Sequence, residues 1–499
     1  MLEISADDII RRVRNENPWW QSPHSITELY RNLRPRAYFA LLFPLISEHS
    51  VRRAVVLMGP RRVGKTVLIY HAIQALIENG VSPNSICYFS VDHPIYNGLS
   101  LEKLLDFYSR ASGLDHKTEK IYAFFDEIQY LRKWEIHLKS LVDTYSNIKA
   151  LASGSAAAAL RLKSEESGAG RFTDFLLPPL SFYEYLDLLG KTDLLTEPPQ
   201  DQEVGNSFFV PSDIEKLNKE FVHYLNYGGY PEVIFSPDIQ ADPVRFIKSD
   251  IIDKVLLRDL PSLYGISDIQ ELNYLFTALA FNTANEISLE ELASNSGVAK
   301  NTIKRYIEYL EAAFLIRLVH RVDRSAKRFK RANFFKVYLA NPSMRAALFS
   351  PVKEGDSEMG ALAETAVFSQ WFHSDFRGLY YARWPDGEVD IVGIREATQK
   401  ANWAVEVKWS DRYCEKPSEL QKVISFCRSN NLDKVLVTSK TKTVECKVGD
   451  VRIRFWPASV YCYTVGFNII HRTRHFEKLP KTTRESDNSI TSQEDLISE

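Results

Sequence analysis

The chain has 499 residues, of which 45% are hydrophobic and 25% are charged, and its formal net charge is −2. This length predicts several domains, and the balanced charge excludes a polycation, so any nucleic-acid contact must come from local basic patches. The five cysteines form no CxxC pair and no apolar run is long enough to cross a bilayer, so we expect a cytoplasmic protein without disulfides, zinc or a membrane partner.

Residues 1–45 are expected to form an N-terminal helical segment. From residue 46 to residue 180, apolar strands alternate with helices. This alternation predicts an α/β fold in which helices cover a parallel sheet. The expected strands contain the segments AVVLM, SICYFSV, YAFFD and KALASG.

The segment GPRRVGKT, residues 59–66, follows the first of these strands and opens a helix. This pattern is typical of a P-loop, in which backbone N–H groups at a helix N-terminus surround a phosphate. Lys65 is expected to reach the β- and γ-phosphates of ATP, and Thr66 to bind Mg²⁺. The alternative is a chance match, and the strand–loop–helix context argues against it. The expected nucleotide contacts are Gly59, Pro60, Arg61, Arg62, Val63, Gly64, Lys65, Thr66 and Val67.

An acidic pair, Asp126 and Glu127, ends the apolar strand in IYAFFDEIQYL. Asp126 is expected to hold the Mg²⁺ shell, and Glu127 to polarise the attacking water. A helix N-cap is the alternative interpretation. The P-loop in the same α/β segment favours the catalytic one.

Two further residues of this segment are candidates for the same site. Ser153 ends the next strand and is expected to sense the γ-phosphate, unless it belongs to a Ser/Gly turn that caps the following Ala-rich helix. Arg171 is a candidate arginine finger, and the alternative is an ordinary surface arginine.

Five segments in order, VLMGPRRVGKT, FFDEIQ, ASGSA, GRF…LPPLSFYEYL and YGGYPEVI, resemble a bacterial and archaeal group of AAA-type ATPases with a C-terminal domain of PD-(D/E)xK nuclease fold. The similarity covers roughly residues 52–456. It implies a catalytic ATP site at Gly59, Gly64, Lys65, Thr66, Asp126 and Glu127. It also implies that Arg171 meets the γ-phosphate of a neighbouring subunit, and hence a homo-oligomer.

Residues 265–331 are expected to form a winged helix-turn-helix module. Ser288 and Glu291 form a capping box, and Gly297 separates two short helices. The second helix begins with groove-facing candidates, and a basic wing follows it; these residues are Lys300, Asn301, Lys304 and Arg305, then Arg317, Arg321, Arg324, Lys327, Arg328, Lys330 and Arg331. DNA is therefore the expected partner. The alternative is a spacer between domains with a solvated basic hairpin.

Two apolar strands farther along, EVDIVGI and WAVEVKW, carry Asp390, Glu406 and Lys408. If these strands pair, Asp390 lies beside Glu406. Glu364, on a preceding helix, completes the order and spacing that the resemblance implies for a PD-(D/E)xK site. We expect Glu364, Asp390 and Glu406 to bind Mg²⁺ or Mn²⁺, and Lys408 to position the attacking water. The alternative is a cross-strand ion pair on a solvated face.

The expected fold is a multidomain α/β protein. Its predicted parts are a P-loop NTPase core (46–180), a helical lid (181–264), the winged helix (265–331), a nuclease-like domain (332–475) and a disordered tail (476–499). The expected function is ATP hydrolysis coupled to DNA binding and metal-dependent DNA cleavage, in genome maintenance or defence against foreign DNA. The alternative is a nucleotide-gated switch or scaffold whose nuclease-fold domain binds but does not cut.

Overall fold

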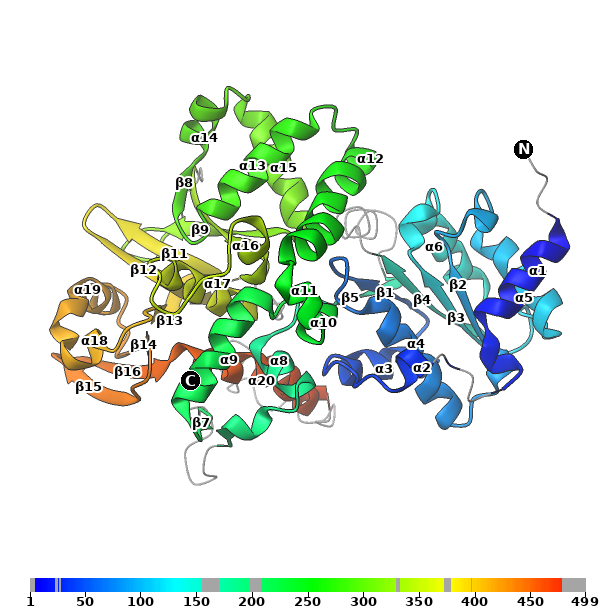
Figure 1. Ribbon diagram of the computed structural model, residues 1–499, viewed down its shortest axis with the longest axis horizontal. Coiled ribbons are helices and arrows are strands. Elements are labelled where there is room, and N and C mark those ends of the chain that lie inside the picture. The colour runs from blue at the N-terminus through cyan, green and yellow to red at the C-terminus, as the bar shows by residue number, and fades with distance from the viewer. Residues whose placement is uncertain are drawn as a thin grey trace. The chain divides into compact units, whose positions relative to one another are not determined.

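The chain divides into two compact units, Met1–Pro178 and Pro179–Glu499 (Figure 1). The predicted boundary between residues 180 and 181 lies close to this division. The computed structural model describes residues 5–22, 26, 28–154, 170–197, 208–328, 333–371, 378–395 and 397–477. The predicted tail lies almost entirely outside these residues.

The first unit is built on a five-stranded parallel sheet with the order β2-β3-β4-β1-β5. Every residue of β1, β3 and β4 is buried, as expected for parallel strands covered on both faces. The predicted parallel α/β fold is confirmed. The strands are β1 (Ala54–Met58), β2 (Ile86–Ser90), β3 (Ile121–Asp126), β4 (Ile148–Gly154) and β5 (Phe172–Leu176).

The N-terminal segment is helical, as predicted, and belongs to the first unit. The side chain of Asn17 donates to the Tyr88 carbonyl at 3.0 Å and accepts the Tyr88 N–H at 2.7 Å. Because β2 is the edge strand, these bonds satisfy backbone groups that would otherwise be left open. The helices of this unit are α1 (Ala6–Glu16), α2 (Glu28–Arg31), α3 (Phe39–Ser47), α4 (Lys65–Glu78), α5 (Leu101–Ser112) and α6 (Trp134–Thr144).

The second unit is built on a nine-stranded mixed sheet with the order β15-β16-β14-β13-β12-β11-β9-β10-β8. The pairs β9–β11, β13–β14 and β14–β16 are parallel, and the other neighbours are antiparallel. The strands are β8 (Glu286–Ser288), β9 (Ile316–Val322), β10 (Phe334–Leu339), β11 (Leu379–Trp384), β12 (Gly387–Arg395), β13 (Lys400–Glu406), β14 (Lys434–Ser439), β15 (Val444–Val448) and β16 (Val451–Pro457). A separate short ladder joins β6 (Leu195–Thr196) to β7 (Val210–Pro211).

Helices surround this sheet, and the segment predicted as a lid is mainly helical. Within the unit, α8 packs against α20, and α9 packs against α16 and α17. The helices are α8 (Phe182–Leu188), α9 (Ile214–Tyr227), α10 (Pro231–Ile234), α11 (Pro237–Ala241), the π-helical η6 (Val244–Asp253) and η7 (Val255–Asp259), α12 (Leu260–Tyr264), α13 (Ile269–Phe281), α14 (Leu289–Ser296), α15 (Lys300–Ala312), α16 (Ser343–Leu348), α17 (Met359–Trp371), α18 (Arg412–Glu415), α19 (Gln421–Ser429) and α20 (Ala458–Glu477).

The segment predicted as a winged helix contains α13, β8, α14, α15 and β9 in that order, and its hairpin continues into β10. The Ser288 hydroxyl accepts the Glu291 N–H at 3.3 Å, and Gly297 ends α14 with a φ of 72°. The basic hairpin is part of the large sheet and not a separate wing, however, because β9 also pairs with β11. The predicted boundary at residue 331 therefore falls inside one continuous sheet. Lys330 and Arg331 lie outside the described residues.

Within the described part of the chain, no helix combines the length and the apolar content that crossing a bilayer requires.

Candidate functional site

The predicted phosphate loop connects β1 to α4 and has the backbone that glycine permits. A Cβ atom on Gly59 would lie 2.2 Å from the Leu177 carbonyl oxygen, so a larger residue does not fit there. Gly64, which precedes α4, has a φ of 93°, in the left-handed region that favours glycine. Both glycines are therefore required by the shape of the loop.

Lys65 and Thr66 begin α4, as the P-loop pattern predicts. The buried Lys65 ammonium donates to the carbonyl oxygens of Gly59 at 3.0 Å and Pro60 at 2.8 Å. The Thr66 hydroxyl donates to Asp126 Oδ2 at 2.7 Å. The structure thus brings together the predicted phosphate-binding lysine, the predicted Mg²⁺ ligands and the end of β3.

Asp126 accepts hydrogen bonds from several directions besides Thr66. Its carboxylate receives the Tyr88 hydroxyl at 3.0 Å, the Glu127 N–H at 3.1 Å and the Ser153 hydroxyl. These contacts fix the orientation of the buried carboxylate. Ser153 lies at the predicted site, beside Asp126. Tyr88 was not predicted, although it lies near the end of β2, next to the strand that carries Asp126.

Glu127 and Arg171 occupy very different places in the first unit. Glu127 follows β3 with a φ of 56°, and its carboxylate accepts from the Gln129 side chain. Arg171 precedes β5 at the end of the sheet opposite the phosphate loop, and it forms an ion pair with Asp143 at 2.9 Å. Arg171 therefore does not reach the phosphate loop of its own domain. Its predicted role stays a prediction for a neighbouring subunit.

Sequence reasoning also missed Arg36, which supports the phosphate loop. This buried guanidinium donates through Nη1 to the Val63 carbonyl at 2.9 Å and to the Pro178 carbonyl at 2.9 Å. It therefore joins the loop to the chain after β5. Arg36 belongs to no sequence motif, so nothing in the sequence around it would have identified this role.

The second predicted group also converges, within the other unit. Val405 of β13 pairs with Ile391 of β12, and this antiparallel register places Asp390 beside Glu406. Lys408 Nζ lies 2.6 Å from Glu406 Oε1 and 3.6 Å from Asp390 Oδ2. The predicted pairing of these strands is confirmed, although β13 ends at Glu406, so Lys408 lies just beyond it.

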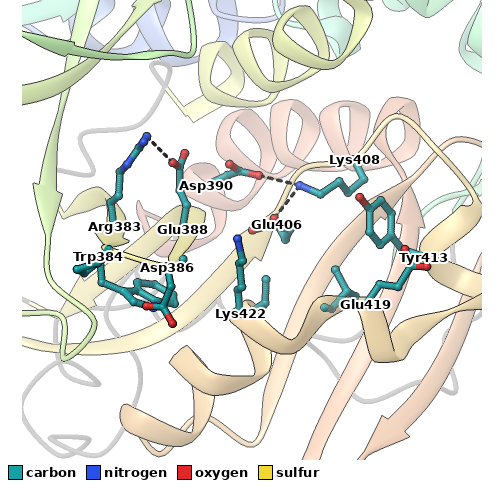
Figure 2. Close-up of a pocket in the computed structure, with 14 residues that line it drawn as sticks. Arg383, Trp384, Asp386, Glu388, Asp390, Glu406, Lys408, Tyr413, Glu419 and Lys422 are labelled. Atoms are coloured by element: carbon teal, nitrogen blue, oxygen red, sulfur yellow. Dashed lines mark hydrogen bonds and ion pairs between the residues drawn. The ribbon is translucent and has the colours of Figure 1, made fainter.

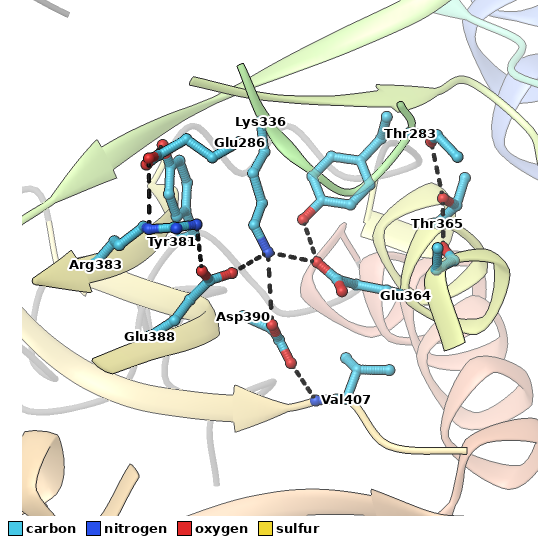
Figure 3. Close-up of polar contacts among 12 residues, drawn as sticks. Thr283, Glu286, Lys336, Glu364, Thr365, Tyr381, Arg383, Glu388, Asp390 and Val407 are labelled. Atoms are coloured by element: carbon cyan, nitrogen blue, oxygen red, sulfur yellow. Dashed lines mark hydrogen bonds and ion pairs between the residues drawn. The ribbon is translucent and has the colours of Figure 1, made fainter. Parts of the chain in front are cut away.

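A lysine that was not predicted, Lys336 of β10, lies on the other side of Asp390 (Figure 3). Its ammonium is 2.5 Å from Glu388 Oε1, 2.9 Å from Glu364 Oε1 and 3.5 Å from Asp390 Oδ1. We call Lys336, Glu364, Glu388, Asp390, Glu406 and Lys408 the acidic cluster. The sequence did hold a signal for Lys336, because FFKVYL is an apolar strand with one charge.

The carboxylates of the acidic cluster differ in their proton affinity. Burial, with the charge of Asp390, raises the pKa of Glu364 to about 7 and that of Glu406 to about 8. Burial also opposes ionisation of Asp390, but Lys408 and Lys336 together hold its pKa below the ordinary value. Burial favours the neutral form of Lys336, yet the surrounding carboxylates keep its pKa well above the ordinary value.

A pocket of about 540 Å³ opens beside this cluster (Figure 2). Asp390, Glu406 and Lys408 line it together with Trp384 and other residues of β11, β12 and the α18–α19 region. The exposed side chain of Lys422, from α19, extends toward Glu406 in Figure 2. The pocket thus combines charged groups of both signs with aromatic walls.

The acidic cluster does not have the form of a metal site. Glu364, Asp390 and Glu406 do converge as predicted, but the cation that lies between Glu364 and Asp390 is Lys336. Within the described residues, no group of three or more His, Cys, Asp or Glu side chains has an arrangement that could hold a metal ion. One buried oxygen, Glu406 Oε2, lacks a hydrogen-bond partner.

The phosphate loop, in contrast, fits nucleotide and Mg²⁺. The loop ends at the N-terminus of α4, and the hydroxyl of Thr66 and the carboxylate of Asp126 are hard oxygen ligands held 2.7 Å apart. Lys65, Thr66 and Asp126 are therefore the residues that would hold Mg²⁺ and the phosphates.

Comparisons with known proteins bear on the first unit most directly. A family model described as an AAA domain matches residues 51–186, and a model described as a domain of unknown function (DUF8612) matches residues 218–354. The uncharacterized protein MJ1637 of Methanocaldococcus jannaschii is 27% identical over 303 residues, which are 58% of this chain and 62% of that protein. This chain therefore covers less than two thirds of MJ1637.

Two more distant likenesses were found. An uncharacterized protein of Haemophilus influenzae is 23% identical over 391 residues, which are 77% of this chain and 88% of that protein. The AMPPCP-bound structure of DnaA from Aquifex aeolicus has a TM-score of 0.27 and 16% identity, over 55% of this chain and 86% of that one. The family match and the loop geometry agree in supporting a P-loop ATPase of the AAA type in the first unit.

Proposed function

We propose that this protein hydrolyses ATP at the phosphate loop and couples the nucleotide cycle to DNA binding by its second unit. The observation that carries the proposal is the contact between Thr66 and Asp126, beside the buried Lys65. Genome maintenance or defence against foreign DNA is the role we infer. The five free cysteines fit a reducing compartment such as the cytoplasm.

Each residue of the loop has a definite task in this proposal. The N–H groups between Gly59 and Thr66 bind phosphate oxygens, and Lys65 exchanges the carbonyls of Gly59 and Pro60 for the terminal phosphates. Thr66 and Asp126 hold the cation, while Glu127 accepts a proton from water. Bound Mg²⁺·ATP supplies the phosphoanhydride bond and the cation that stabilises charge on the phosphates.

Substitution of Lys65 tests the ATPase proposal. We expect Lys65→Ala to lower steady-state ATP hydrolysis by at least about a hundredfold, because the variant lacks the ammonium that stabilises negative charge on the phosphates in the transition state. Lys103→Ala is the matched control, since Lys103 is an exposed lysine of α5 in the same unit. Hydrolysis by Lys65→Ala at the wild-type rate would refute the assignment.

The DNA-binding part of the proposal is supported by α15. Ile303, Tyr306, Ile307 and Leu310 are buried on one face of this helix, and Lys300, Asn301, Lys304 and Arg305 are exposed near its start. Some basic residues of both elements have partners within the protein: Arg321 of the wing pairs with Glu286 at 3.6 Å, and Lys300 of α15 pairs with Glu290 at 2.7 Å. Lys304 and Arg305 lie exposed on the face of α15 away from its buried residues. We therefore assign the contact to α15, as in helix-turn-helix proteins.

Fluorescence anisotropy with duplex DNA at several salt concentrations tests this assignment. The double variant Lys304→Ala/Arg305→Ala should bind more weakly and lower the slope of log affinity against log salt by about 2. Lys400→Ala/Lys447→Ala, two exposed lysines of β13 and β15, is the control. Binding that is indifferent to salt, or to the α15 variant, contradicts the proposal.

A second candidate function is cleavage of a phosphodiester, with Asp390, Glu406 and Lys408 facing the substrate in an open pocket, although the ion pairs of Lys336 argue against a divalent cation beside them. Incubation with plasmid and Mg²⁺ or Mn²⁺ tests it. Cleavage that is lost in Asp390→Ala and Lys408→Ala supports a nuclease. No cleavage with ATP, ADP or no nucleotide supports a switch or scaffold whose second unit binds but does not cut.

A homo-oligomer forms part of the proposal, because Arg171 does not reach the phosphate loop of its own domain. Arg171→Ala should lower ATP hydrolysis in the assembled protein if a neighbour uses this arginine. Sedimentation with and without a non-hydrolysable nucleotide shows whether an assembly forms.

A further inference from the structure

The feature that the proposed function leaves unexplained is Lys336, a charged side chain only 3% exposed. It extends from β10 toward carboxylates on two other elements, Glu364 of α17 and both Glu388 and Asp390 of β12 (Figure 3). A buried ammonium is strongly unfavourable unless carboxylates surround it, and buried carboxylates need a cation equally. Lys336 therefore offsets the negative charge of the carboxylates around it.

Oxygens of Glu364 and Asp390 that a metal between these two residues would require are already engaged. Glu364 Oε1 receives both Lys336 and the Tyr338 hydroxyl, the latter at 2.6 Å. Asp390 Oδ2 receives the Val407 N–H at 2.9 Å. A divalent cation needs several oxygens at about 2.0–2.6 Å, so it would have to take these oxygens from their present donors.

Repulsion adds to this competition. A divalent ion bound between Glu364 and Asp390 would lie within a few ångströms of the Lys336 ammonium in a site shielded from water. Like charges at that separation cost several kcal/mol even at an effective dielectric constant of about 20. The ion and Lys336 therefore cannot share the space between these two carboxylates.

Side chains neutralise most of the charge of the cluster. Lys336 lies on one side of Asp390 and Lys408 on the other. Arg383, a neighbour of the cluster, pairs with Glu388 at 2.8 Å and with Glu286 at 3.4 Å. Asp390 therefore has a lysine on each side without any metal ion.

We propose that Lys336 is the built-in counter-ion of the acidic cluster and takes the place of a divalent cation, so that the cluster binds neither Mg²⁺ nor Mn²⁺ while Lys336 is present. A ligand of the neighbouring pocket is then bound without a metal, through Lys408 and Lys422. This inference does not rest on ATP hydrolysis or on DNA binding, both of which are measured separately.

Equilibrium binding of Mn²⁺ to the full-length, nucleotide-free protein tests the proposal, with free Mn²⁺ followed by electron paramagnetic resonance. The quantity of interest is the binding that Asp390→Asn removes, because this difference excludes Mn²⁺ held at the phosphate loop. Wild type should show no such binding at millimolar Mn²⁺. Lys336→Met should gain one site, and Lys336→Met/Asp390→Asn should lose it. Lys447→Met, a substitution at an exposed lysine of the same sheet, should behave like wild type.

Two results would overturn the proposal. One is Mn²⁺ binding to the wild-type protein that Asp390→Asn abolishes. The other is a folded Lys336→Met protein that binds no Mn²⁺. If Lys336→Met does not fold, Lys336→Gln replaces it, since glutamine removes the charge but can still donate a hydrogen bond to the carboxylates. That variant should bind Mn²⁺ in a manner dependent on Asp390, and its failure to do so would also contradict the proposal.

Discussion

The two lysines at the candidate sites, Lys65 and Lys336, are both buried but are held in different ways. Lys65 donates to the carbonyls of Gly59 and Pro60, which carry only partial charges. Lys336 lies between the carboxylates of Glu364, Glu388 and Asp390. A phosphate can therefore attract Lys65 away from its partners, whereas full charges hold Lys336 in place. The first lysine is available to a ligand, and the second is already neutralised.

The phosphate loop is therefore suited to bind an anion, whereas the charged residues of the acidic cluster pair with one another. At the phosphate loop, one lysine and the start of α4 carry positive charge, and the lysine donates its hydrogen bonds to the carbonyls of Gly59 and Pro60. In the acidic cluster, the lysines and carboxylates face one another. A lysine that follows acidic residues in a sequence motif is therefore not by itself evidence of catalysis. The positively charged side chains around the carboxylates in the folded protein must be known first.

The largest predicted effect concerns local stability. Lys336→Ala should lower the free energy of local opening around β10 and β12 by about 3–5 kcal/mol, because it leaves buried carboxylates without their partner. Lys65→Ala should lower it around β1 and α4 by only about 1 kcal/mol, the value of ordinary hydrogen bonds. Hydrogen exchange measured on peptides from each region gives both quantities in the full-length chain.

Lys447→Ala is the control for this pair, because Lys447 is exposed on β15. Equal protection changes at the two buried lysines would remove the contrast between them. A larger change around Lys65 would reverse it.

The phosphate loop could be predicted because its residues are adjacent in the sequence. Gly59, Lys65 and Thr66 lie in one turn between a strand and a helix, and Asp126 lies at the end of a strand that apolar residues define. In a parallel sheet, strand ends meet at one edge. Local pattern and strand order were therefore enough to bring Thr66 and Asp126 together.

Residues that support these sites from elsewhere in the chain could not be predicted in the same way. Arg36 and Tyr88 reach the first site from a loop and from a neighbouring strand, and neither belongs to a motif. The reasoning used for Asp390 could also have identified Lys336, since each is a charged residue in a largely apolar strand. What sequence alone could not supply was the sheet order β12-β11-β9-β10, which brings β10 into the same sheet as β12.

The second prediction concerns pH. The pKa of Glu406 is raised from 4.5 to about 8 in the folded protein, so the folded state keeps a proton that the unfolded state loses above about 4.5. Its contribution to stability is complete below that pH and is lost as the pH rises through about 8, with a slope of at most about 1.4 kcal/mol per pH unit for one proton. Thermal unfolding between about pH 5.5 and pH 8.5 should show this fall.

Glu406→Gln should make the fall in stability with pH less steep, because an amide does not ionise, while Glu364, whose pKa is raised to about 7, still contributes in this range. Glu445→Gln, on exposed β15, should keep the wild-type slope. The same slope in wild type and Glu406→Gln would mean that Glu406 does not carry the proton. Asp390 does not confound this range, since its pKa is lowered and it titrates below the window.

The smallest predicted effect is at Tyr88, whose hydroxyl donates to the same Asp126 oxygen as Thr66. Tyr88→Phe should raise the Mg²⁺ concentration for half-maximal ATP hydrolysis by about tenfold, because residues that orient a metal ligand typically affect affinity on that scale. Nucleotide affinity measured without Mg²⁺ should stay unchanged, which separates positioning of Asp126 from a general disturbance of the fold. Tyr122→Phe is the matched control, since this tyrosine of β3 packs against His49 instead. An unaltered Mg²⁺ dependence, or an equal loss of metal-free nucleotide affinity, would show that Tyr88 does not orient Asp126.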